Sequence, residues 1–397
     1  MITEIKEIFR SLAINQYKIF MYTVRQIRED YTRAGLQQDI RKEIVYYVLF
    51  FSMGTRIFRI ELAGNRHPGL RNALRQLMDK GEWYCEAEDG SFFNDKLTDL
   101  SSPSAEQLDT TRISDLFSGD LNIVQAQYVR TVCSLDFYTA GDHCRQTSVS
   151  SSLQALAEIM PGFPARELIV QDPVNMQDVL AELRQQKERM LKNIADSSLP
   201  AVEYTGSECV ISPEISEMLL SFLCSVLRGD SILAGTSFLS AEDFHKPLFS
   251  NSLSVFRDHG LSGIASEHIT GERKYYIRNG ILESAFNDLK TASYLNQPDG
   301  DAFFDPDELK TLISIRNVRI DPAVSAAPDV PVFDSIIGTR FFFNPMTGKL
   351  DMLLRSPSGY SRRIQGSIIQ LFNCVKGAVM PDGASDPEAF GLLVDFR

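Results

Sequence analysis

Histidine and cysteine are the side chains of this 397-residue chain that could serve as metal ligands, bases or nucleophiles. The five histidines are His67, His143, His245, His259 and His268, and none of them is followed by glutamate. A helical metalloprotease site needs two histidines one turn apart to hold zinc, and a glutamate beside the first to activate water. That arrangement is therefore absent from the sequence.

A histidine–carboxylate site of another kind is the alternative that a stand-alone hydrolase would require. Its residues would be His245, His259 and His268, with Asp243, Asp258 and Glu267 close by in the sequence. The spacings of fourteen and nine residues between these histidines fit no metal-ligand template. We therefore interpret the three histidines as surface or loop residues and keep the hydrolase as the alternative hypothesis.

A cysteine nucleophile would need a histidine base within reach. His143 and Cys144 are adjacent in sequence, but neighbouring side chains of a strand point to opposite faces. The sequence also lacks a Gly-x-Ser-x-Gly elbow and a phosphate-binding Gly-x-x-x-x-Gly-Lys-Ser/Thr loop. We predict no catalytic, cofactor-binding or metal-ligating residue in this chain, and no cofactor of its own.

Five carboxylates gather close to residue 300. They are Asp299, Asp301, Asp305, Asp307 and Glu308. The alternation and the central glycine of an EF-hand calcium loop are missing from this segment. The cluster therefore predicts a solvated acidic loop.

Long strands dominate the prediction for the first half of the chain. Residues 17–33 and 40–51 are rich in β-branched and aromatic residues and flank Gly35, which predicts an antiparallel pair. A third strand, a helix from Pro68 to Gly81 and a long amphipathic helix over 176–194 follow. We expect an N-terminal α/β domain with long antiparallel strands and helices over residues 1–198.

The second half begins after the turn-forming segment 196–200. A short strand over 208–211 precedes a helix over 215–227, for which Ser212 is the expected N-cap and Pro213 the first helical residue. Strands then prevail, and Asn279-Gly280 predicts a tight hairpin turn. We expect a C-terminal β-rich domain over residues 199–397, and an α+β fold for the whole chain.

The composition excludes several kinds of partner. Lys and Arg total 40 against 52 Asp and Glu, so the formal net charge is −12. This charge repels nucleic acid and anionic membrane, and we expect neither as a partner. The N-terminus has no signal-peptide pattern, and the six cysteines form no Cys-x-x-Cys pair. A cytoplasmic protein with reduced thiols is the prediction.

The segment from 208 to 295 carries an ordered set of elements that resembles the TldD/TldE (PmbA) family. The set comprises Val210-Ile-Ser-Pro-Glu214, the helix to Leu227, Gly229, Gly235-Thr-Ser-Phe-Leu239, a strand over 250–258, the Asn279-Gly280 hairpin and a short helix over 289–295. The resemblance implies the fold of that family. The first half matches more loosely, and past residue 300 the match is limited to 344–348 and 366–377.

The same resemblance implies a division of labour between two subunits. In the family the TldD-like subunit carries a His-Glu-x-x-x-His helix and a downstream cysteine that complete a zinc site, whereas the TldE-like subunit lacks these ligands. The corresponding helix of this chain has no histidine, and Cys224 lies inside that helix. The chain therefore resembles the metal-free TldE-like branch, and zinc is expected in a TldD-like partner.

The sequence thus leads to three hypotheses. The first is a non-catalytic subunit of a heterodimeric zinc metalloprotease that degrades or matures small peptides, including modified or leader peptides of natural-product pathways. The second is the stand-alone hydrolase described above. The third is a homodimeric peptide-binding scaffold. In the first hypothesis the partners are a TldD-like catalytic subunit and a peptide.

Overall fold

The structure is a computed structural model, and it describes the chain except for residues 65–66, 87–92, 94–99, 102–107, 162–163, 198–201, 258–272, 307, 316–317, 325–329, 381–389 and 397. The chain divides into two compact units. Unit 1 comprises Met1–Ile194 and Phe304–Thr311, and unit 2 comprises Ala195–Phe303 and Leu312–Arg397.

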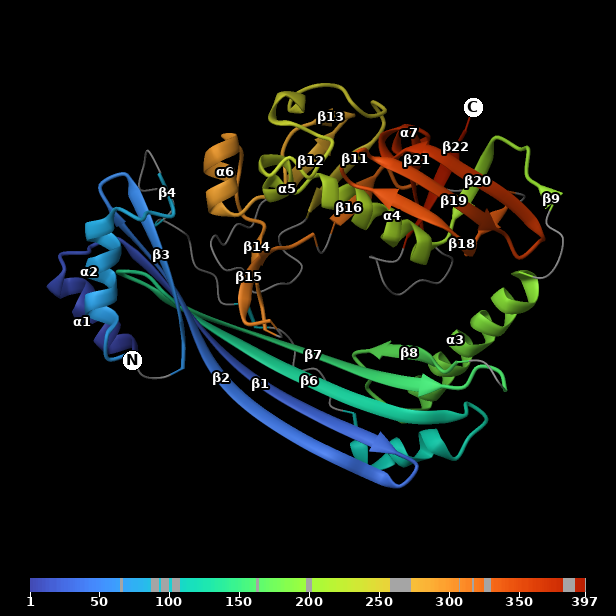
Figure 1. Ribbon diagram of the computed structural model, residues 1–397, viewed down its shortest axis with the longest axis horizontal. Coiled ribbons are helices and arrows are strands. Elements are labelled where there is room, and N and C mark those ends of the chain that lie inside the picture. Colours follow the sequence, from blue (N-terminus) through green and yellow to red (C-terminus); the bar gives the residue numbers. More distant parts are fainter. Residues whose placement is uncertain are drawn as a thin grey trace. The chain divides into compact units, whose positions relative to one another are not determined.

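Unit 1 is built on one sheet with the strand order β4-β3-β2-β1-β6-β7-β5, and β8 also pairs with β7. The strands are β1 (Tyr17–Thr32), β2 (Gly35–Met53), β3 (Arg56–Ala63), β4 (Cys85–Glu86), β5 (Leu100–Ser101), β6 (Ile123–Tyr138), β7 (His143–Ala157) and β8 (Arg166–Gln171). Only the β5–β7 pairing is parallel among those described. The four long strands β1, β2, β6 and β7 run side by side (Figure 1).

The helices of unit 1 pack at the two ends of these long strands (Figure 1). They are α1 (Ile2–Ser11), α2 (Leu70–Lys80), the 3-10 helix η2 (Thr110–Phe117) and α3 (Met176–Ser197). At one end α1 and α2 share an apolar cluster with β2, which includes Phe9, Leu74 and Phe51. At the other end η2 and α3 share a second cluster with β6, β7 and β8. Each helix therefore buries its apolar face against the sheet.

The predicted antiparallel pair is confirmed. Tyr17 lies opposite Phe51, and Gly35 with φ +101° closes the turn opposite Thr32. The second strand begins at Gly35 rather than at residue 40, because the polar residues that follow the turn continue the ladder. The helix predicted from Pro68 begins at Leu70 and ends, as expected, at a left-handed Gly81.

A segment from the second half of the sequence belongs to unit 1. The strands β14 (Ala302–Asp305) and β15 (Lys310–Ile313) form a two-stranded ribbon. The ring of Phe304 stacks on Tyr22 at 3.9 Å and lies 5.3 Å from the ring of Tyr46. Phe304 is buried, so this contact supplies core packing on the face of β1 and β2 that carries these two tyrosines.

Unit 2 contains three four-stranded sheets, with the orders β17-β10-β22-β21, β13-β12-β11-β16 and β18-β19-β20-β9. The strands are β9 (Val202–Glu203), β10 (Glu208–Ile211), β11 (Ser254–Arg257), β12 (Lys274–Arg278), β13 (Ile281–Leu282), β16 (Val318–Asp321), β17 (Val332–Phe333), β18 (Ser335–Asn344), β19 (Lys349–Arg355), β20 (Tyr360–Ser367), β21 (Val375–Val379) and β22 (Gly391–Asp395). The helices are α4 (Pro213–Val226), α5 (Gly229–Leu233), the 3-10 turn η3 (Ala241–Asp243), α6 (Leu289–Leu295) and α7 (Ile368–Asn373). The expected α+β class is confirmed.

One large apolar core holds unit 2 together, and α4 runs through it. The predicted N-terminus of this helix is confirmed, because Ser212 is the N-cap residue and Pro213 is the first helical residue. The predicted hairpin is also confirmed, because Asn279 and Gly280 take the positive φ angles of 50° and 78° that a type I′ turn requires.

Candidate functional site

Helix α4 corresponds to the helix that carries the zinc ligands in the TldD-like subunit of the family it resembles. It is hydrogen-bonded to one strand from the beginning and one from the end of the sequence of unit 2. The buried hydroxyl of Ser216 donates to the carbonyl of Ile211 at 3.1 Å and accepts from the backbone N–H of Leu392 at 3.0 Å. Ile211 ends β10 and Leu392 lies in β22, so a single side chain ties the helix to two adjacent strands. The position of α4 is therefore well defined.

The side chains of α4 do not fit a zinc ion. The helix contains one potential sulfur ligand for zinc, Cys224. This thiol is buried, and burial raises its pKa far above its usual range. Zinc binds the thiolate rather than the thiol. The two carboxylates of the helix, Glu214 and Glu217, are exposed. Among the described residues, no group of three His, Cys, Asp or Glu side chains lies close enough to hold a metal ion.

An aromatic stack occupies the partly exposed face of α4. The ring of Phe222 stacks on Phe341 and Phe343 of β18, with centroids 5.4 and 4.6 Å apart. Phe341 and Phe343 lie two residues apart and so share one face of the strand. The side of α4 that packs on β18 is therefore apolar, and the accessible ligand atoms of the helix are those of the exposed Glu214 and Glu217.

Of the three histidines of the alternative hydrolase site, His245 is the one that lies among the described residues. His245 is exposed, and its backbone N–H donates to the carbonyl of Leu282 at 2.7 Å. The nearby Asp243 caps a turn by accepting from the backbone and hydroxyl of Ser240. The remaining members, His259, His268, Asp258 and Glu267, lie outside the described residues.

The other histidines have structural contacts. His143 is exposed and pairs with Asp136 at 3.2 Å, whereas the adjacent Cys144 is buried on the opposite face of β7. The two side chains therefore lie on opposite faces of the strand, as strand alternation predicts. The Nε2 atom of His67 lies 3.1 Å from the carbonyl oxygen of Gly64.

The prediction of a solvated acidic loop is wrong for Asp301, whose side chain is fully buried. It accepts hydrogen bonds from Arg257 Nη1 at 2.6 Å and from the hydroxyl of Tyr276 at 2.5 Å. The N–H of Asn287 donates at 2.8 Å, and the ammonium of Lys274 forms a second ion pair. A buried carboxylate is tolerated when it is paired and hydrogen-bonded in this way.

The remaining members of that acidic cluster follow the prediction more closely. Glu308 is exposed, Asp299 and Asp305 are partly exposed, and Asp307 lies outside the described residues. The Asp301 network instead connects segments of unit 2 that are far apart in the sequence. Arg257 on β11 and its cross-strand partner Lys274 on β12 both pair with Asp301. The network is therefore a structural tie within that unit.

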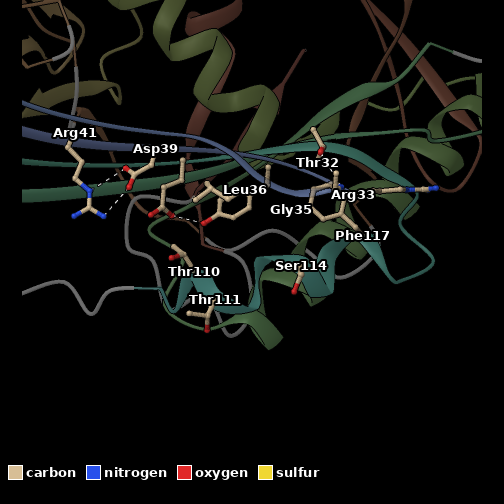
Figure 2. A pocket seen from close by; sticks show the side chains of 13 residues that line it. Thr32, Arg33, Gly35, Leu36, Asp39, Arg41, Thr110, Thr111, Ser114 and Phe117 are labelled. Atoms are coloured by element: carbon tan, nitrogen blue, oxygen red, sulfur yellow. Dashed lines mark hydrogen bonds and ion pairs between the residues drawn. The ribbon is translucent and has the colours of Figure 1, made fainter.

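A cavity of about 620 Å³ is found in unit 1, between the end of the β1–β2 hairpin and η2 (Figure 2). Two carboxylates line it, and they are directly opposite each other across the hairpin: Glu29 on β1 and Asp39 on β2. Glu29 accepts from the hydroxyl of Tyr31 at 2.7 Å, and Asp39 pairs with Arg41 at 3.1 Å. The sequence analysis missed this site, because counting residues outward from the turn pairs Glu29 with Gln38, and only the register shift between Asp30 and Tyr31 brings Glu29 opposite Asp39.

The sequence and the fold of this chain resemble those of known proteins. Residues 206–351 match the family model of the PmbA/TldA metallopeptidase C-terminal domain. No curated protein matches the sequence. A candidate modulator of DNA gyrase from Thermotoga maritima has a similar fold, with a TM-score of 0.69, 13% identity and coverage of 100% of this chain and 99% of that chain.

Two further solved structures share the fold over the whole chain. TldE from Thermococcus kodakarensis matches with a TM-score of 0.64 at 10% identity, covering 98% of each chain. A candidate modulator of DNA gyrase from Bacteroides thetaiotaomicron matches with a TM-score of 0.63 at 15% identity, covering 99% of this chain and 98% of that chain. At these identities the structures establish the fold alone.

The matched domain is metallopeptidase-related, and it lies within a chain that folds into two compact units. Residues 206–351 are thus similar to the C-terminal domain of the PmbA/TldA metallopeptidases, and the chain shares the fold of TldE and of the two candidate gyrase modulators. No helix among the described residues is long and apolar enough to cross a membrane.

Proposed function

We propose that this chain is the non-catalytic subunit of a TldD/TldE-type heterodimeric zinc metalloprotease that acts in the cytoplasm. Its partner is a TldD-like subunit that carries the His-Glu-x-x-x-His helix and holds the zinc. The two subunits together degrade or mature small peptides, including modified or leader peptides. This chain contributes walls of the peptide-binding chamber rather than reacting groups.

The observation that carries this proposal is the chemistry of α4. A zinc site needs neutral imidazoles, thiolates or carboxylates that converge on one point. Here the helix packs apolar side chains into the core and stacks Phe222 on Phe341 of β18, and its buried Cys224 is held in the protonated form. Yet the helix is firmly anchored through Ser216. A retained helix that carries no histidine supports a subunit that relies on another chain for the metal.

The similarity to TldE from Thermococcus kodakarensis supports the choice of branch. That likeness extends over both units and includes the long-stranded sheet as well as the matched C-terminal domain. A fold shared over the full length, with no metal-ligand cluster among the described residues, favours a role in assembly. A heterodimer is the simplest assembly in which one such chain completes the site of another.

The experiment is co-expression of this chain with an affinity-tagged TldD-like protein that carries the zinc motif. We expect both chains to be retained together and native mass spectrometry to give the mass of one copy of each. As a control, the tagged partner is replaced by an unrelated zinc protease of similar size, which should retain nothing. Retention by neither protein, with this chain eluting as a monomer or homodimer, would overturn the heterodimer.

A further inference from the structure

The cavity of unit 1 brings four charged side chains of the β1–β2 hairpin together, in equal numbers of each sign. The acidic pair is Glu29 and Asp39, and the basic residues are Arg33 and Arg41. The hydroxyls of η2 and the apolar groups of Leu36 and Phe117 complete the lining (Figure 2). A volume of about 620 Å³ lies within the range of roughly 300–1,000 Å³ typical of small-ligand sites.

The two carboxylates need an explanation, because like charges directly opposite each other across a strand pair destabilise a sheet. Arg41 compensates Asp39 through two nitrogen–oxygen contacts of 3.1 and 3.3 Å. Tyr31 donates one hydrogen bond to Oε2 of Glu29. Oε1 of Glu29 has no hydrogen-bond partner among the described residues, so the acidic pair that lines the cavity retains acceptor capacity.

The hydroxyl of Tyr31 stays protonated and keeps Glu29 in place. Burial, followed by the hydrogen bond to Glu29, raises the pKa of Tyr31 to about 12. The phenol therefore donates to the carboxylate of Glu29 at any physiological pH and fixes its orientation. A primary ammonium carries three donors and could bind both Glu29 and Asp39.

Arg33 lies at the other end of the cavity, on the exposed turn that follows β1. It forms no ion pair within the described part of the chain. Arg33 follows Glu29 by four residues, which corresponds to roughly 13 Å at about 3.3 Å per strand residue. A guanidinium in this position can bind a carboxylate through two parallel hydrogen bonds.

We propose that this cavity binds a short zwitterionic peptide of about three to four residues, with its amino terminus at Glu29 and Asp39 and its carboxylate at Arg33. The span of roughly 13 Å matches three to four extended residues at up to about 3.6 Å each. The hydroxyls of Thr110, Thr111 and Ser114 can serve the peptide groups in between. The choice of peptides as the ligand class rests on the proposed function, and products of a peptidase have this chemistry.

The test is isothermal titration of the full chain, without any partner, with trialanine and tetra-alanine. We expect saturable binding that weakens at least tenfold when the amino terminus is acetylated, and likewise in Glu29→Gln and in Asp39→Asn. The glutamine still accepts from Tyr31, so the sheet is preserved. Arg33→Gln should weaken binding of the free peptide but not of the C-terminally amidated one.

Glu43→Gln is the matched control, because Glu43 lies on β2 outside the cavity and pairs with the exposed Arg25. It should bind peptide as the unaltered chain does. The inference is overturned if the unaltered chain shows no saturable binding at millimolar peptide, if acetylated and free peptides bind equally, or if Glu29→Gln has no effect. Because the titration needs no second subunit, its failure leaves the retention experiment with the TldD-like protein unaffected, and the reverse also holds.

Discussion

At the scale of single residues, Asp301 is held between two cations at full burial. We expect Asp301→Asn to lower the free energy of unfolding by about 3–5 kcal/mol, because Arg257 and Lys274 would remain buried without their anion. Urea unfolding followed by circular dichroism measures the loss. Asp299→Asn is the control, since Asp299 contributes its backbone carbonyl to Lys274 and should change stability little. Equal effects of the two substitutions would contradict the account.

Buried thiols give a second residue-scale prediction, for alkaline pH. Burial raises the pKa of Cys133 and of Cys209 to about 12, from an ordinary value near 9. The folded state therefore favours the protonated thiol, and its stabilisation is complete below pH 9 and is lost as the pH rises towards 12. Each thiol contributes a slope of about 1.4 kcal/mol per pH unit in that window.

Urea midpoints measured between pH 8 and pH 11 test this slope. In Cys209→Ala the fall in the free energy of unfolding above pH 9 should become shallower by the contribution of one thiol. Cys374→Ala is the comparison, because Cys374 is only partly buried. If the pH dependence of Cys209→Ala is the same as that of the unaltered chain, this thiol does not contribute.

At the scale of elements, the ribbon β14–β15 contributes Phe304 to the core of unit 1. We expect Phe304→Ala to destabilise unit 1 by about 3–5 kcal/mol, because the substitution leaves a cavity against Tyr22 and Tyr46. Trp83 is the only tryptophan of the chain and lies in unit 1, so its fluorescence reports on this unit. The urea midpoint of the tryptophan signal should fall.

Phe303→Ala is the matched control for that prediction. Phe303 precedes Phe304 directly but belongs to unit 2, where the guanidinium of Arg257 lies 5.0 Å from its ring centroid. It should shift the tryptophan midpoint less than Phe304→Ala does. A larger shift for Phe303→Ala would mean that the ribbon does not stabilise unit 1 through Phe304.

The β12–β13 hairpin gives the second element-scale prediction. A Cβ on Gly280 would lie 2.4 Å from the carbonyl oxygen of Phe249, and the residue has φ +78°. Gly280→Ala should cost roughly 2–5 kcal/mol, from a left-handed conformation at about 1–2 and crowding at about 1–3. Gly235→Ala shares a left-handed φ of +66° in open space, so thermal unfolding should show only the smaller cost for it.

At the scale of the whole molecule, periodicity and turn chemistry predicted the long strands, the helix α4 and the Asn279-Gly280 hairpin, because these depend on neighbours in sequence. The burial of Asp301 could not be predicted, since Arg257 lies 44 residues away and supplies the compensating charge. The cavity was missed for the same reason: Thr110 and Ser114 reach the β1–β2 hairpin only in the folded unit. The lack of histidine on α4 was evident from the sequence itself.

The central claim is that this chain completes a peptidase without supplying its metal. Peptide hydrolysis is the measurement that tests it most directly, with this chain alone, the TldD-like chain alone and the two mixed, alongside zinc analysis of each sample. We predict cleavage by the mixture only, with one zinc per heterodimer, and no cleavage when the partner's motif glutamate is replaced by glutamine. If the purified chain alone holds stoichiometric zinc and cleaves peptide, the claim is wrong.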